Sequence, residues 1–151
     1  MAAAAAAPAR TDVLVVRVPL DGDLAAAAEA VCAGLHPGDV VALSGDVGAG
    51  KTSLVRACAH RLGAKGPVTS PTFALAHRYD GPLPIAHLDL YRLADQPGRD
   101  TADLLGELGD DCVAFVEWPE AGAGWLPRAN VHVTIDVAAD GERRFAIARA
   151  A

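Results

Sequence analysis

The fold of this 151-residue chain is decided by the stretch Gly45-Asp46-Val47-Gly48-Ala49-Gly50-Lys51-Thr52. It matches the phosphate-binding loop pattern, in which a glycine and four further residues precede Gly-Lys-Ser/Thr. Glycines allow successive main-chain amide hydrogens to point inward, and the helix that begins here adds the positive end of its dipole. We therefore predict a loop that binds phosphate, with Lys51 reaching the β- and γ-phosphates of a nucleotide and Thr52 ligating Mg2+.

The segments on either side of the loop fit this prediction. Residues 40–43 are apolar on both faces, as expected of a buried parallel strand. After the loop, apolar residues recur at helical spacing over 51–62, and Gly63 is placed to end that helix. A chance glycine-rich turn is the alternative, but such a turn does not require a buried strand before it and an amphipathic helix after it.

The rest of the chain alternates between strand and helix patterns. Asp23 can begin a helix that ends at Pro37, and Asp100 and Asp103 can open a short one. Strands are predicted at 13–18, 73–79, 85–90 and 112–116, followed by a closing hairpin at 131–137 and 144–148. These elements predict an α/β, P-loop NTPase-like sandwich with a mixed, mainly parallel central sheet and a C-terminal β-hairpin. We expect residues 1–10 to form a disordered Ala-rich tail and 11–151 to form a single domain.

Composition excludes several classes of protein. Hydrophobic residues make up 52% and charged residues 21% of the chain, which is the profile of a folded domain and not of a disordered one. The formal net charge is −6 and the only lysines are Lys51 and Lys65, so the chain lacks a basic field for direct nucleic-acid binding. The apolar run from Ala2 to Ala7 is far shorter than the roughly 18 residues of a membrane span. With three cysteines that lack zinc-site spacing, this predicts a cytoplasmic protein without a membrane partner.

Two acidic residues are candidates for a metal-binding or catalytic role beside the loop. Glu117 follows the most apolar predicted strand, where α/β sheets bind ligands at the carboxyl ends of their strands. Asp89 interrupts an otherwise apolar strand. A nucleotide loop needs such an acid to hold magnesium or to orient water. The alternative is a strand-end acid paired with an arginine, with Arg92 as the partner for Asp89, and the residues alone leave both interpretations open.

Three other positions carry weaker signals. The run from Ser70 to Phe73 places hydroxyls beside a proline, in the loop where other phosphate-loop proteins keep γ-phosphate sensors. Trp118 stands beside Glu117, although a tryptophan there is more typical of a core than of a base-stacking platform. His87 has no histidine partner at metal-ligand spacing, so a histidine satisfied within its strand is the better interpretation.

Four segments together resemble the TsaE (YjeE) family over about residues 35 to 120. They are the loop itself, Thr69-Ser70-Pro71-Thr72-Phe73, His87-Leu88-Asp89-Leu90-Tyr91-Arg92 and Glu117-Trp118-Pro119-Glu120. The resemblance implies a bacterial ATP-binding and ATP-hydrolysing protein that is required for the threonylcarbamoyl modification of adenosine 37 in transfer RNA. Its partners would be TsaD and TsaB, with transfer RNA contacted only indirectly through that complex, and residues 11–151 would be a single P-loop ATPase domain.

The same resemblance assigns roles to residues. Lys51, Asp89 and Glu117 would be catalytic, with Asp89 positioning water, and Thr52 and Glu117 would hold Mg2+. The residues that bind ATP would be Gly45, Asp46, Val47, Gly48, Ala49, Gly50, Lys51, Thr52, Ser53, Thr72 and Trp118. The chain departs from the family at Asp21-Gly22-Asp23-Leu24, where members often carry a threonine near the nucleotide base.

Other nucleotide-dependent functions remain alternatives of differing weight. A GTPase is disfavoured because the only asparagine, Asn130, does not lie in an Asn-Lys-x-Asp guanine-binding motif. A small-molecule or nucleotide kinase would need a lid bearing several arginines, and only Arg92 and Arg99 are available in the right region. A non-hydrolysing ATP-dependent assembly switch is not distinguished by sequence from an ATPase, because such ATPases can be slow until a partner completes the site. We expect slow hydrolysis that partner proteins stimulate.

Overall fold

The computed structural model describes residues 13–66, 76–91, 106, 108–122, 124 and 126–150. Its elements are, in chain order, β1 (Val13–Val18), α1 (Ala25–Cys32), β2 (Val40–Ser44), α2 (Lys51–Arg61), β3 (Ala76–Tyr79), β4 (Ile85–Asp89), β5 (Val113–Glu117), the 3-10 turn η3 (Pro119–Gly122), β6 (Val131–Val137) and β7 (Arg143–Arg149). The predicted tail at 1–10, Ser70, Thr72, Arg92, Arg99 and the start of the short helix at Asp100 lie outside the described residues.

The strands form one seven-stranded sheet in the order β1-β7-β6-β2-β5-β4-β3. The pairs β2–β5, β2–β6 and β4–β5 are parallel, whereas β1–β7, β6–β7 and β3–β4 are antiparallel. The mixed sheet and the C-terminal hairpin of β6 and β7 are therefore confirmed. The expectation of a mainly parallel sheet is corrected, because the two hairpins and the edge strand β1 make as many antiparallel pairs as the centre makes parallel ones. The links from β3 to β4 and from β6 to β7 are too short for a parallel crossover, so these strands pair antiparallel.

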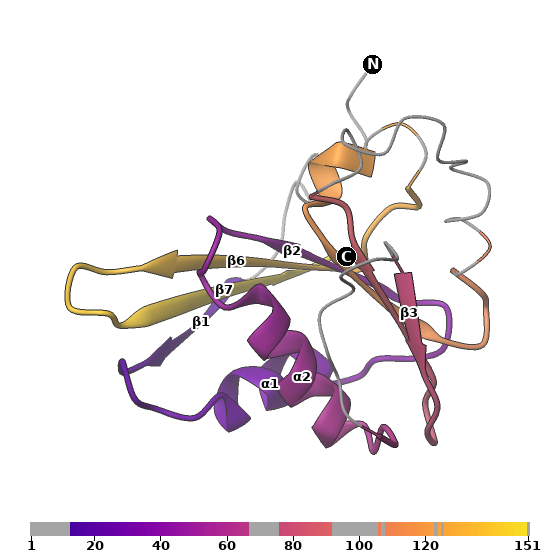
Figure 1. Ribbon diagram of the computed structural model, residues 1–151, viewed down its shortest axis with the longest axis horizontal. Coiled ribbons are helices and arrows are strands. Elements are labelled where there is room, and N and C mark those ends of the chain that lie inside the picture. Colours follow the sequence, from indigo (N-terminus) through magenta and orange to yellow (C-terminus); the bar gives the residue numbers. More distant parts are fainter. Residues whose placement is uncertain are drawn as a thin grey trace.

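Helices α1 and α2 pack on one face of the sheet, and η3 lies on the opposite face (Figure 1). Alternation along β5 serves both layers: Val113 and Phe115 join the core under the helices, whereas Ala114 and Val116 join the second core on the other side. Because β5 is buried on both faces, its sequence shows the continuous apolar run that predicted a buried strand. The central strands β2 and β5 are thereby fixed in place, and both end at the same edge of the sheet.

Both helices begin near the points that their sequences indicate, but only α2 ends close to the expected point. The amide of Ala25 donates a hydrogen bond to Asp23 Oδ1 at 2.9 Å, although the cap residue of α1 is Leu24, which makes no side-chain cap. Helix α1 ends at Cys32, earlier than predicted. Helix α2 ends at Arg61, whose positive charge interacts favourably with the negative end of the helix dipole. In the ranges that the structure describes, neither helix has the length and hydrophobicity to cross a bilayer.

Replacing Phe115 tests how much the fold depends on the central strand. Phe115 is fully buried between β2 and β4 under α2, so Phe115→Ala should lower the free energy of unfolding by about 3–5 kcal/mol. Val137 is 53% exposed at the end of β6, so Val137→Ala should change the free energy of unfolding by less than about 0.5 kcal/mol. Chemical denaturation of both variants measures the difference, and similar losses would contradict the assigned core.

Candidate functional site

The glycine-rich segment 45–50 connects the end of β2 to the start of α2. Gly50 occupies the position before the first helical residue with φ of 110°, in the left-handed region that favours glycine. At Gly45 a side chain would be obstructed, because a Cβ would lie 3.0 Å from the carbonyl oxygen of Ile135 and 3.2 Å from the Cβ of Ala49. The loop therefore turns tightly against β6 before it enters the helix.

Lys51 begins α2, and its side chain folds back over the loop. Its Nζ donates hydrogen bonds to the carbonyl oxygens of Gly45 at 2.5 Å and Asp46 at 3.0 Å. The same ammonium lies 4.3 Å from the centroid of the Trp118 ring, within the range of a cation–π contact. Burial lowers the pKa of Lys51, and the neighbouring carboxylates, Glu117 foremost, partly oppose that shift. The cation is thus held inside the site by main-chain oxygens and an aromatic face.

Glu117 reaches α2 because of strand periodicity. Residues two apart on a strand share a face, so Glu117 follows Val113 and Phe115 onto the face that α2 covers. There Thr52 Oγ1 lies 2.9 Å from Glu117 Oε2 and 3.1 Å from Oε1, and the hydroxyl donates to the carboxylate. Glu117 is 3% exposed. This contact joins the end of the loop to the neighbouring strand.

The adjacent strand β4 adds two side chains on the same face. In the parallel register Asp89 pairs with Glu117, and His87 precedes it by two residues. His87 Nε2 lies 2.6 Å from Glu117 Oε2, and the imidazole is fully buried. Asp89 is half-buried; its Oδ1 accepts the Tyr91 amide at 3.1 Å, and burial raises the pKa of Asp89, with the nearby Glu117 adding to the shift. Three titratable groups from two strands therefore meet opposite the loop.

An aromatic pair lies against this cluster. The rings of Tyr91 and Trp118 are 4.9 Å apart between centroids and inclined at 42°. Trp118 has φ of 59° and is the one non-glycine residue with positive φ in the part of the chain that the structure describes. Its amide still donates to the carbonyl oxygen of Leu43 at 3.3 Å. The unusual backbone turns the chain directly after Glu117 and keeps the indole over Lys51.

A pocket of about 320 Å³ is lined by most of the site residues predicted from sequence. Its lining includes Val47, Gly48, Gly50, Lys51, Thr52, Ser53, Asp89, Tyr91, Glu117 and Trp118. Three further loop residues, Gly45, Asp46 and Ala49, line a second hollow toward β6 instead. Thr72 lies outside the described residues.

Sequence reasoning missed Tyr91 and the contact of His87 with Glu117. The available signal was the spacing of His87 and Asp89, two residues apart, which places them on one strand face beside the strand that carries Glu117.

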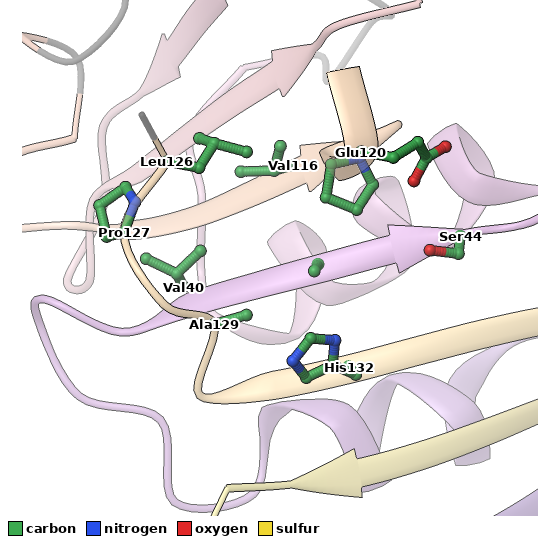
Figure 2. A pocket seen from close by; sticks show the side chains of 10 residues that line it. Val40, Ser44, Val116, Glu120, Leu126, Pro127, Ala129 and His132 are labelled. Atoms are coloured by element: carbon green, nitrogen blue, oxygen red, sulfur yellow. The ribbon is translucent and has the colours of Figure 1, made fainter. Parts of the chain in front are cut away.

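A separate pocket of about 80 Å³ lies on the sheet face opposite α1 and α2. Figure 2 shows Val40 and Ser44 along β2, His132 on β6, and Leu126 and Pro127 on the segment that crosses above them. Glu120 of η3 and Ser44 at the end of β2 also line this pocket (Figure 2). The residues of the loop itself do not line this pocket. It is therefore distinct from the site between the loop and the two strand-end acids.

The donor set beside the loop suits Mg2+ bound together with a phosphate. Thr52 and Glu117 offer hydroxyl and carboxylate oxygens, the hard ligands that Mg2+ prefers. Among the described residues, no group of three or more His, Cys, Asp or Glu side chains could hold a metal by itself. Mg2+ at phosphate-transfer sites uses one or two carboxylates, waters and the substrate's own oxygens, so this sparse set fits such a site.

Comparison with known proteins gives a consistent result. The family model described as threonylcarbamoyl adenosine biosynthesis protein TsaE matches residues 19–145. Curated proteins named tRNA threonylcarbamoyladenosine biosynthesis protein TsaE are similar to this chain. The one from Haemophilus influenzae is 41% identical over 99 residues, which span 64% of this chain and 62% of that protein. The one from Bacillus subtilis is 38% identical over 121 residues, which span 80% and 75%.

A solved structure extends the similarity to three dimensions. The crystal structure of Bacillus subtilis YdiB matches with a TM-score of 0.76 and 31% sequence identity. The match covers 94% of this chain and 88% of that chain.

Replacing Asp89 by its amide should stabilise the protein more at neutral pH than in acid. The ordinary pKa of the carboxyl is 3.8, and burial raises it in the folded state, so the folded protein binds this proton more tightly than the unfolded chain. The free energy of unfolding therefore falls as pH rises from 3.8 through the raised pKa, because Asp89 then loses its proton in a half-buried position. Asp89→Asn keeps the Oδ1 acceptor and removes that loss. Thermal melts at about pH 7 and about pH 3 should show a higher Tm for the variant at pH 7 and a smaller gap at pH 3; a constant gap would contradict the burial of this charge.

Proposed function

The chain belongs to the TsaE family, and we propose that it is an ATP-binding and ATP-hydrolysing component of the bacterial machinery that makes N6-threonylcarbamoyladenosine at position 37 of transfer RNA. The proposal rests on one observation above all: the Thr52 hydroxyl at the end of the loop meets the Glu117 carboxylate of the neighbouring strand at 2.9 Å. This is the arrangement in which a P-loop NTPase holds Mg2+ against a nucleotide. The family and the similar proteins are named for threonylcarbamoyladenosine biosynthesis, which supports the proposed pathway.

The loop would bind the triphosphate through its main chain and Lys51. The glycines at positions 48 and 50, both with positive φ, let the loop curl around an anion, and α2 begins with its positive end toward it. The Lys51 ammonium already lies in the pocket, where the carbonyl oxygens of Gly45 and Asp46 accept its hydrogens. Phosphate oxygens would replace these two neutral acceptors with charged ones, which form stronger hydrogen bonds with an ammonium.

Thr52 and Glu117 would hold Mg2+, which supplies charge neutralisation for the phosphates when it is bound. Asp89, in register with Glu117 on the next strand, would position the attacking water. Ser53 and Trp118 line the same pocket and would contact the nucleotide. Thr72 stays a proposed nucleotide contact on the family motif alone. We assign Lys51, Asp89 and Glu117 as the catalytic residues.

The proposed partners are TsaD and TsaB, with transfer RNA reached only through them. A formal net charge of −6, from 13 basic and 19 acidic residues, gives this chain little means of holding RNA itself, and Lys51 lies inside the proposed nucleotide pocket. Asp89 and Glu117 lie opposite the loop, but the pocket is open beside them. A protein that closes over this opening would exclude bulk water, strengthen the electrostatic interactions around the phosphates and leave the water that Asp89 positions to attack.

ATP turnover with and without the partners tests this function. We expect slow hydrolysis by the purified chain and at least about a tenfold increase with TsaD and TsaB, because a second protein often completes a P-loop site. Lys51→Ala is the matched control. It should abolish turnover in both conditions while circular dichroism shows an intact fold, since this side chain contacts the loop and the ligand space and not the apolar core.

Three outcomes would each contradict a part of the proposal. Undiminished turnover by Lys51→Ala would reject the loop as the nucleotide site. Equal rates with and without TsaD and TsaB would reject the coupling to the modification machinery, and a wild-type chain that binds ATP without turnover in their presence would favour an assembly switch over an ATPase.

A further inference from the structure

His87 is a buried titratable residue that the proposed function leaves without a role. It lies in the middle of β4, is fully buried, and faces the nucleotide pocket's acids and not the second core. Placing a polar imidazole there costs free energy unless its nitrogens are hydrogen-bonded, and an aliphatic side chain would fill a strand interior without that cost. The neighbouring buried positions on β4, Ile85 and Leu88, are indeed aliphatic. The histidine therefore needs a reason beyond packing.

The hydrogen bond to Glu117 supplies that reason. Nε2 lies 2.6 Å from Glu117 Oε2, and an ionised carboxylate only accepts, so the hydrogen of this bond belongs to Nε2. The other nitrogen, Nδ1, is buried and has no hydrogen-bond partner among the described residues. Among the described residues, the one hydrogen bond of the imidazole therefore goes to one oxygen of the Glu117 carboxylate.

This contact makes the two carboxylate oxygens of Glu117 unequal. Oε2 accepts from His87 and shares the Thr52 hydroxyl, whereas among the described residues Oε1 has only the Thr52 hydroxyl, at 3.1 Å. A carboxylate on a two-methylene side chain can otherwise rotate about its terminal bond with little preference. A short hydrogen bond from a rigid, fully buried ring removes that freedom and fixes Oε2, so that Oε1 stays beside the Thr52 hydroxyl.

We propose that His87 is a positioning residue, which anchors Oε2 of Glu117 so that Oε1 and the Thr52 hydroxyl are presented together to Mg2+. This inference rests on the proposed function, because it concerns how the chain prepares its own side of the magnesium site. Hydrogen-bond partners of metal ligands typically change metal affinity by about 10–100-fold when they are removed. His87 should therefore set the Mg2+ dependence of nucleotide binding and leave the phosphate loop itself unaffected.

Three substitutions separate positioning from packing. In His87→Gln the side-chain amide nitrogen can reach about as far as Nε2, whereas in His87→Asn it falls short at the position of Nδ1, so the two amides differ in reach and not in chemistry. His87→Leu removes the donor altogether. His77→Leu is the matched control, because His77 pairs with His87 across β3 and β4, and among the described residues it contacts Tyr79 and not Glu117.

The experiment measures binding of mant-AMPPNP, a fluorescent non-hydrolysable ATP analogue, to the full chain in EDTA and over a range of free Mg2+. In EDTA, all variants should bind the analogue within about twofold of wild type. The Mg2+ concentration for half-maximal enhancement should rise by about 10–100-fold in His87→Leu and His87→Asn, and by less than about threefold in His87→Gln and His77→Leu. Thermal melts establish that each variant is folded.

Each alternative result bears on a different claim. Unchanged Mg2+ dependence in folded His87→Asn and His87→Leu would overturn the positioning role, as would an equal loss of binding with and without Mg2+. Failure of all three His87 variants to fold would also overturn it, by showing a purely structural residue. A wild-type chain whose binding of the analogue does not respond to Mg2+ would instead refute the magnesium site in the proposed function.

Discussion

The hydrogen bond between Thr52 and Glu117 is the contact on which the rest of the site depends. It joins the first turn of α2 to the carboxyl end of β5, and it forms only because β2 and β5 are parallel neighbours that end at the same edge of the sheet. The period of two along β5 then turns Glu117 toward the helix and not toward the second core. Local sequence, sheet register and chemistry are consistent here, which is what a site with defined geometry requires.

The same site holds opposing charges in a partly buried space. Burial lowers the pKa of Lys51 and raises that of Asp89, so each charge is disfavoured by its surroundings and favoured by the other. Main-chain oxygens and the Trp118 ring take up the ammonium. A phosphate would offer stronger hydrogen-bond acceptors for this cation. Because the ammonium also contacts the Trp118 ring, its transfer to phosphate would couple nucleotide binding to the conformation of Trp118 and Tyr91.

Sequence reasoning predicted the elements that carry strong local signals. The loop, the two helices and the apolar strand before Glu117 follow from glycine spacing and hydrophobic period, and the structure describes them with small shifts at their ends. Sequence reasoning did not reveal the balance of parallel and antiparallel strand pairs, because the pairing between β1 and β7 joins segments more than 120 residues apart. The left-handed backbone of Trp118 has no pattern in a single sequence, and the spacing of His87 and Asp89 predicts the bond from His87 to Glu117 only once β4 and β5 are known to be neighbours.

A crystal structure with AMPPNP and Mg2+ tests the central claim most directly. The account predicts β- and γ-phosphates enclosed by residues 45–52, the Lys51 ammonium transferred from the Gly45 carbonyl to phosphate oxygen, and the metal held on the side of Thr52 and Glu117. A nucleotide bound elsewhere, or a bound nucleotide with Lys51 still on its own loop and Glu117 turned away from Thr52, would contradict it.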